Sequence, residues 1–265
     1  MNFLEALLFG LVQGITEFLP VSSSGHLTLL GRILQTDETA MLSFTTLLHV
    51  GTLISVFLVM RREIAAMLRD LLGLRVRLIV LATIPAVLAA LLLGDLIDKL
   101  FGGAYLAWSF LITGIGLAST LLLRKPADPE KPIGYKEALL AGVGQAVAIA
   151  PGVSRSGMTL TALLFSGIER EKAIRFSFLM SIPAILGGFL LDLVDMIKGE
   201  GAALASFGLL NILGGVAAAA VAGWLAMTFM LRHLKRRGFL ICAAYVLLLA
   251  VLVFIDQTWT HLVFA

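Results

Sequence analysis

The sequence is poor in cysteine and in charge. Its 265 residues include a single cysteine, Cys242, which excludes an intramolecular disulfide and a cysteine metal cluster. Only 14% of the residues are charged, against roughly 25% in a typical soluble domain. Hydrophobic residues make up 59% of the chain, and its mean hydropathy is +1.00. These values exclude an ordinary soluble domain and indicate an integral membrane protein.

Several common signatures are also missing. The chain has no Walker phosphate-binding loop, and its basic residues lie between apolar runs, so we expect no nucleic-acid partner. The first residues lack a basic stretch and include Glu5, so we expect no cleaved signal peptide.

Apolar runs of nearly twenty residues recur, and each is long enough to cross a bilayer as a helix. The expected spans are roughly 44–60, 78–94, 105–123, 176–191, 209–231 and 239–256. The predicted fold is therefore an all-α integral membrane protein, with one membrane domain over residues 1–265.

One polar segment interrupts this apolar pattern near the start of the chain. Residues 13–26 read QGITEFLPVSSSGH, so a glutamate, a proline, three serines and a histidine fall within ten residues. Polar groups at membrane depth cost free energy unless they are paired or wetted, and irregular backbone there must be buried in protein or line a cavity. The segment therefore predicts a broken, re-entrant helix pair whose tip holds a site.

The chain also repeats itself after 132 residues. Residues 5–58 align without a gap on 137–190, with 14 identities in 54 positions, and both polar motifs fall in the same register. We expect a first repeat over 1–123, a cytoplasmic linker over 124–136 and a second repeat over 137–265. Each half would hold one re-entrant helix pair and three transmembrane helices. Three crossings invert the second half, which predicts an inverted-topology repeat with a shared site near the midplane.

The distribution of basic residues predicts the orientation. Sixteen of the twenty lie in the segments 61–77, 124–136, 166–175 and 232–238, which share one side in this topology. The other side holds only Arg32, Lys99 and Lys198. By the positive-inside rule the linker is cytoplasmic and both termini are outside. An alternative topology, with residues 7–30 and 137–163 as full spans, would place these basic segments on both sides of the membrane.

The first motif offers an acid, hydroxyls and an imidazole. Gln13 and Glu17 share a helix face, where they could hold a metal ion, steer a water or pair with Arg155. Pro20 ends the first half-helix. The serines and the glycine that follow either bind an anion at the next helix N-terminus or only cap it, namely Ser22, Ser23, Ser24 and Gly25. His26 could activate a serine or protonate a leaving oxygen.

The second motif, PGVSRSG at 151–157, repeats this arrangement with arginine at the position of Ser23. The guanidinium of Arg155 is planar and matches phosphate oxygens, so a phosphate site explains both tips. Ser154, Ser156 and Gly157 would bind the substrate beside it. His49, in an apolar helix, could line the cavity or bond to a neighbouring helix.

With these motifs in hand, the chain resembles the bacterial undecaprenyl-diphosphate phosphatases of the bacitracin-resistance type, nearly from end to end. The resemblance rests on QxxxEFLPVSSSGH at 13–26 and PGVSRSG at 151–157. Gln13 stands where many members carry glutamate, which weakens a two-carboxylate metal site. The resemblance implies hydrolysis of a lipid pyrophosphate to the monophosphate, which recycles the carrier for peptidoglycan synthesis and confers bacitracin resistance. It also implies a divalent cation (Mg²⁺ or Ca²⁺), a bacterial plasma membrane location, and an active site that opens to the outer face.

Two mechanisms remain open at this stage. In one, Ser23 is the nucleophile with His26 as its base or as the acid for the leaving group, Arg155 holds phosphate charge, and Glu17 binds the cation, with Gln13 as a second candidate ligand. In the other, a water attacks and Ser23 only binds phosphate. The expected partners are a polyprenyl diphosphate and membrane lipids, with a homodimer left open. The alternative function is a flippase or transporter of a polyprenyl phosphate lipid, since inverted repeats with broken helices are also a transporter design.

Overall fold

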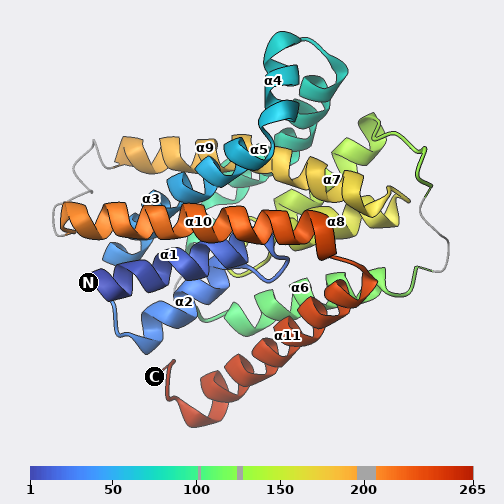
Figure 1. Ribbon diagram of the computed structural model, residues 1–265. Helices are drawn as coiled ribbons and strands as arrows, with labels where there is room; N and C mark the ends of the chain where they lie inside the picture. Colours follow the sequence, from blue (N-terminus) through green and yellow to red (C-terminus); the bar gives the residue numbers. More distant parts are fainter. Residues whose placement is uncertain (101–102, 124–127, 196–206, 265) are drawn as a thin grey trace.

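The computed structural model describes residues 1–100, 103–123, 128–195 and 207–264 (Figure 1). Parts of the expected linker (124–127) and Lys198 therefore lie outside the described residues. The described chain is helical, and its one extended pairing is an isolated bridge between Asp128 and Ile168. Its α-helices are α1 (Phe3–Phe18), α2 (Ser23–Ile33), α3 (Glu38–Val59), α4 (Arg61–Arg69), α5 (Leu74–Leu100), α6 (Leu106–Thr120), α7 (Tyr135–Val147), α8 (Arg155–Phe165), α9 (Arg170–Asp195), α10 (Leu209–His233) and α11 (Arg236–Ile255).

Five helices of the described chain are long and apolar enough to cross a membrane, which confirms an all-α multi-pass protein. The candidate spans are Met41–Val59, Leu74–Leu93, Arg170–Leu190, Leu209–His233 and Arg236–Thr260. The expected span over 105–123 is shorter than predicted, because α6 has 15 residues and rises only about 22 Å. Leu121, Leu122 and Leu123 belong to its apolar run in the sequence but form turns after the helix. Hydrophobicity alone cannot distinguish those turns from helix.

Two helical hairpins stand where the polar motifs were found. The helices α1 and α2 meet at Pro20, and α7 and α8 meet at Pro151. The longest of the four, α1, has 16 residues and rises about 24 Å, which is less than the ~30 Å hydrocarbon core. Neither arm of either hairpin spans the core alone, as expected for re-entrant pairs.

The turns between the arms are built by small polar residues. Ser22 has a φ of 75°, which is unusual for a residue with a side chain, and its hydroxyl accepts a hydrogen bond from the Gly25 amide. Ser154 caps α8 in the same way through the Gly157 amide, after Gly152 turns the chain at a φ of 86°. Both caps direct the first residue of the following helix, Ser23 or Arg155, toward the centre of the molecule.

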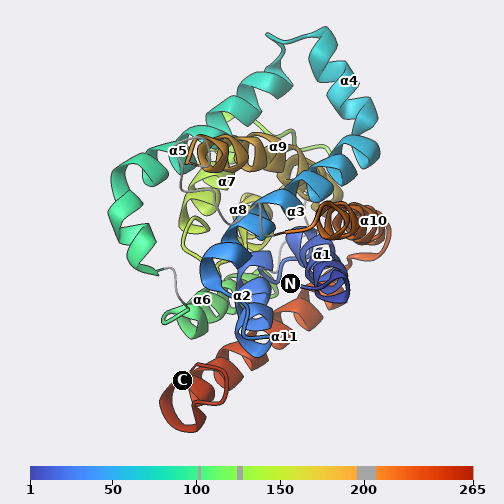
Figure 2. The same cartoon turned by 90° about the vertical axis from the view of Figure 1, so that its left-hand side faces the viewer.

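The two hairpins enter the molecule from opposite ends. In Figure 1 the first hairpin begins and ends on the left, where both termini lie, whereas the second begins and ends on the right. Viewed from the left, α2, α7 and α8 lie near the middle, with α5, α9, α10 and α11 around them (Figure 2). This arrangement agrees with the expected topology. The repeat symmetry itself and the side that faces the cytoplasm stay predictions.

A close helix–helix contact fixes the position of α1. Gly10 and Gly14 lie so near α10 that an added Cβ on Gly10 would overlap the Gly215 carbonyl oxygen, and one on Gly14 would come within 2.5 Å of the Ala219 carbonyl oxygen. Small residues at such interfaces let two backbones approach. Gln13 and Glu17 lie on the same buried side of α1 as these two glycines, so the contact with α10 also fixes where their side chains stand.

Candidate active site

Glu17 stands at the centre of the polar cluster between the two hairpin tips. Its Oε2 accepts hydrogen bonds from the Ser23 hydroxyl at 2.6 Å and from the Gln13 amide at 3.2 Å. Its Oε1 accepts a hydrogen bond from Nη2 of Arg155 at 3.0 Å. The carboxylate is buried, and these charged and neutral donors compensate its lost hydration.

The cluster joins residues that lie far apart in the sequence. Gln13 and Glu17 are one turn apart on α1, Ser23 is the first residue of α2, and Arg155 is the first residue of α8. Arg155 is also held by the Ser177 carbonyl oxygen of α9, 3.3 Å from its Nη1. The pairing of Glu17 with Arg155 therefore links the two halves and leaves the rest of the guanidinium fork for a ligand.

Two further hydrogen bonds lock the hairpin tips together. The Gly152 amide donates to the Ser24 hydroxyl at 3.1 Å, and the Ser156 hydroxyl donates to the Leu19 carbonyl oxygen at 3.1 Å. Each bond joins one tip to the other. The relative positions of Ser23 and Arg155 thus depend on both hairpins.

A hollow of about 250 Å³ opens onto this cluster. Its polar lining residues are Thr16, Glu17, Ser22, Ser23, Ser24, Thr46, His49, Ser154 and Arg155. The remaining wall is formed by Ala148 and Val153 of the second hairpin tip and by residues of α9, including Ala184, Ile185 and Phe189. Two larger hollows, of about 630 and 930 Å³, lie at the linker end of the molecule and contain none of these polar residues.

The predicted binding residues divide into two groups. Ser22, Ser24 and Ser154 line the hollow, and Ser22 and Ser154 also cap helices, while anion binding by these serines stays a prediction. Gly25, Ser156 and Gly157 are buried behind it. A Cβ on Gly25 would come within 2.7 Å of the Phe110 ring, so close packing explains this glycine.

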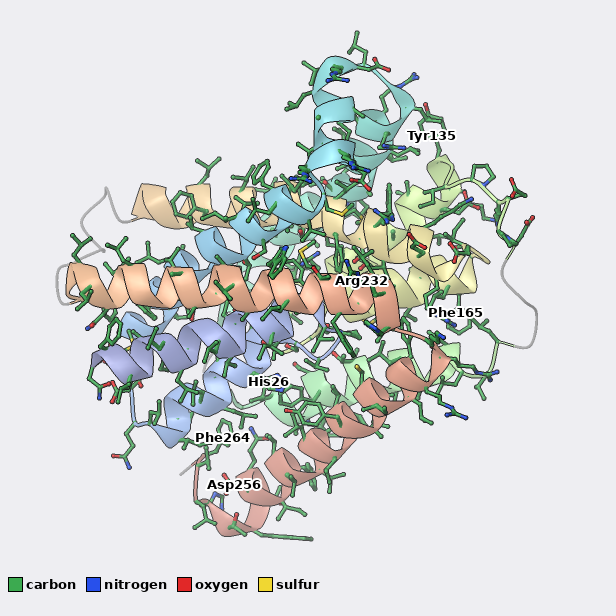
Figure 3. All side chains as sticks on the ribbon, in the orientation of Figure 1. His26, Tyr135, Phe165, Arg232, Asp256 and Phe264 are labelled. Carbon is green, nitrogen blue, oxygen red and sulfur yellow. The ribbon has the colours of Figure 1, made fainter. Side chains whose placement is uncertain are left out.

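His26 lies outside the cluster. Its Nδ1 donates to the Ser22 carbonyl oxygen at 2.6 Å, and its Nε2 is 2.8 Å from the Tyr245 hydroxyl. The imidazole stacks on the Tyr245 ring, with centroids 5.6 Å apart, and faces α11 (Figure 3). Because both ring nitrogens are engaged there, the structure does not bring His26 to the Ser23 hydroxyl as the serine–base hypothesis requires. This geometry instead ties α2 to the rest of the protein.

A different histidine lines the hollow. Nδ1 of His49 donates to the Thr45 carbonyl oxygen at 2.8 Å, which turns Nε2 toward Glu17, 3.7 Å from Oε2. The sequence left His49 open between a cavity and a neighbouring helix, and the structure places it in the cavity. Its alignment with Ser181 in the second repeat was the only signal that could have marked it.

Oxygen ligands for a hard cation lie in the hollow and behind its wall. The Glu17 carboxylate lines the hollow, whereas Oε1 of Gln13 is buried beside it and has no hydrogen-bond partner among the described residues. The described residues contain no group of three or more His, Cys, Asp or Glu side chains suited to a metal ion. Such a set fits Mg²⁺ or Ca²⁺ only as a partly hydrated ion that completes its coordination with substrate oxygens.

Comparison with known proteins covers nearly the whole chain. The family model described as "Bacitracin resistance protein BacA" matches residues 6–252. A relative from Bacillus cereus, "Undecaprenyl-diphosphatase 4", is 39% identical over 254 residues, 96% of each chain. An "Undecaprenyl-diphosphatase" from Carboxydothermus hydrogenoformans is 39% identical over 258 residues, 97% of this chain and 98% of the relative. One from Korarchaeum cryptofilum is 35% identical over 89% of this chain and 92% of the relative.

Proposed function

The chain belongs to the bacitracin resistance protein BacA family, and from this membership we propose that it hydrolyses undecaprenyl diphosphate to undecaprenyl phosphate and inorganic phosphate. This reaction would return the lipid carrier to cell-wall synthesis and so oppose bacitracin. The substrate's pyrophosphate would occupy the hollow between the tips, and its tail would lie among the apolar helices.

One observation carries the assignment of the chemistry. The Ser23 hydroxyl donates to Glu17 at 2.6 Å, and Arg155 stands beside the same carboxylate. A carboxylate that accepts a serine proton is the arrangement of a general base and its nucleophile. A fixed guanidinium at the same point stabilises the negative charge of a transferring phosphoryl group. Transport alone would need the arginine but gives no reason for a serine paired with an acid.

The chemical step follows from these contacts. Oγ of Ser23 attacks the terminal phosphorus, its proton passes to Glu17, and the bond between this phosphorus and the bridging oxygen breaks. The lipid monophosphate leaves, and water then cleaves the phosphoserine to release inorganic phosphate. In the competing version a water makes the first attack and Ser23 only binds a phosphate oxygen.

The divalent cation is part of the proposal. Glu17 and the free Oε1 of Gln13 would hold Mg²⁺ or Ca²⁺ together with the oxygens of the substrate. When bound, the cation would neutralise pyrophosphate charge and make the terminal phosphorus easier to attack. Glu17 would then have to exchange one of its present donors for the cation.

The position of the hollow supports access from the outer face. Thr46 lies in the first half of α3 and His49 at its midpoint, and Ile185 and Phe189 lie toward the end of α9. Both of these helix ends are on the side of the molecule that carries the termini (Figure 1). That side is the outer face in the topology predicted from charge. Residence in the bacterial plasma membrane belongs to the same proposal, and so does the assembly state, with a homodimer still open.

The test is phosphate release from undecaprenyl diphosphate by the purified protein in detergent, with Mg²⁺, with Ca²⁺ and with EDTA. We expect cation-dependent release that falls about 100-fold or more in Arg155→Ala, the loss typical of removing a preorganised charge. Arg69→Ala, at an exposed position on α4, is the matched control and should retain activity. No release from a folded protein that still binds the lipid would favour transport instead.

Ser23→Ala separates the two mechanisms. Loss of phosphate release in this variant, together with trapping of a phosphorylated Ser23 in the wild type, would support Ser23 as the nucleophile. Full activity in this variant would exclude it and favour the attacking water. Ser119→Ala, which removes only a hydroxyl bonded within α6, is the control for a serine-to-alanine change.

A further inference from the structure

A second polar hollow lies at the other end of the molecule from the candidate active site. It has a volume of about 930 Å³ and lies where α3 passes into α4 and α10 ends. Arg61, Arg62 and Arg232 line it together with Arg175, and its apolar wall includes Leu58 and Trp224. Figure 3 labels Arg232 near the end of α10. The phosphatase proposal assigns no role to this site.

The charge of the hollow is unbalanced. Its two acids, Glu63 and Glu171, are both paired with the same guanidinium, that of Arg175, at 2.6 and 2.9 Å. Three arginines remain, and in the described part of the chain none of them forms an ion pair with an acidic side chain. With four arginines against two glutamates, the lining has a net charge of +2. The three arginines without an acidic partner are exposed to an incoming ligand.

The hollow also lies at the boundary between the membrane and water. The candidate spans of α3 and α10 end at Val59 and His233, next to the arginines. Below the arginines, the outward faces of these helices are apolar, since Leu58 and Trp224 are 57% and 46% exposed. A ligand that fits both parts has an anionic head and hydrocarbon tails.

We propose that this hollow binds an anionic diacyl phospholipid, with its phosphate among Arg61, Arg62 and Arg232 and its acyl chains along α3 and α10. The leaflet that the positive-inside rule assigns to this end is the one rich in anionic lipid. A bound lipid would bridge the end of α3 and the end of α10. It would thus brace the helix that carries His49 against the helix that supports α1.

The experiment measures lipid binding by the full chain in detergent. Phosphatidylglycerol is titrated into the protein, with phosphatidylcholine as the zwitterionic comparison, and bound lipid is counted by native mass spectrometry while the melting temperature is followed. We expect phosphatidylglycerol to bind and to raise the melting temperature, and phosphatidylcholine to do neither. In a variant with Arg61→Gln, Arg62→Gln and Arg232→Gln the affinity should fall roughly fivefold for each arginine, or about 100-fold in all.

A matched control removes the same charge elsewhere at the same end. Arg69→Gln, Arg77→Gln and Arg237→Gln change exposed arginines that do not line the hollow. Retained binding in this variant and lost binding in the first would support the proposal, whereas equal losses would reduce the effect to general surface charge and overturn it. Displacement of phosphatidylglycerol by an equal concentration of undecaprenyl phosphate would also overturn it, because the hollow would then be a product site. If the triple variant does not fold, the same test compares phosphatidylglycerol binding by the single variants Arg232→Gln and Arg237→Gln.

Discussion

At the level of single residues, the burial of Glu17 gives its partners a double role. Arg155 both compensates a carboxylate that is almost removed from solvent and presents donors to the hollow. Removing one partner of a buried ion pair leaves an uncompensated charge, which typically costs about 3–5 kcal/mol. The activity of Arg155→Ala therefore has to be interpreted beside its melting temperature. A combined Glu17→Gln and Arg155→Gln variant, which removes both charges, should recover stability but not phosphate release.

The two histidines can be distinguished by which ring nitrogen each uses. The bond from Nδ1 of His26 to the Ser22 carbonyl oxygen fixes the turn before Ser23. An asparagine amide can reproduce that bond but cannot act as a base. We expect His26→Asn to keep most of the phosphate release and His26→Ala to lose about tenfold, roughly the net contribution of one such bond. Equal, near-complete losses in both variants would return His26 to the role of base.

His49 makes the opposite prediction, because its Nε2 is the atom near Glu17. A glutamine places an amide nitrogen close to the position of Nε2. We therefore expect His49→Gln to retain activity within a few fold and His49→Ala to lose more than tenfold, with the loss in kcat. Steady-state kinetics on both variants checks this. Unchanged kcat in His49→Ala would mean that the imidazole only lines the cavity.

At the level of elements, the contact between α1 and α10 positions the catalytic face. A side chain at Gly14 would meet the Ala219 carbonyl oxygen at 2.5 Å and the Gly223 amide nitrogen at 2.7 Å. Both are backbone atoms, so the helices would have to move apart. Because Gly14 lies within one helical turn of Glu17 on the same helix, any such displacement would be transmitted directly to the carboxylate.

We expect Gly14→Val to lower the free energy of unfolding by about 1–3 kcal/mol, as overpacking of a close interface does. The measurement is the melting temperature in detergent, followed by phosphate release at a temperature where the variant is folded. Gly187→Ala is the control, since nothing lies within 4 Å of its added Cβ. A Gly14→Val protein as stable and active as the wild type would show that α1 is not fixed by this contact.

At the level of the whole molecule, the orientation decides which leaflet supplies the substrate. The chain has one cysteine, so Cys242→Ser gives a background for labelling. Glu130→Cys reports on the linker and Leu262→Cys on the C-terminal end, and both positions are exposed. In intact cells we expect a membrane-impermeant maleimide to label Leu262→Cys, and to label Glu130→Cys only after the cells are opened. The reverse pattern would invert the topology and place the hollow toward the cytoplasm.

Much of this protein was predictable from its sequence, because the signals are local. Apolar runs identified the spans, and Pro20 and Pro151 with their serines and glycines identified the breaks between half-helices. The repeat register brought Ser23 and Arg155 to equivalent positions before any contact was known. The turns after α6 were missed because leucine favours a helix, so the run of leucines at 121–123 gave no sign that the helix ends at Thr120.

Which polar side chains meet depends on how distant segments pack together. His26 is three residues from Ser23, yet the rotation of α2 directs it to Tyr245 on α11. His49 is far from Glu17 in sequence, yet the packing of α3 beside α1 brings the two within 3.7 Å. Membrane residence, the two broken helices and the residue types of the site follow from local sequence patterns. The partners of each histidine depend on how separate helices are rotated and packed, and no local pattern encodes that.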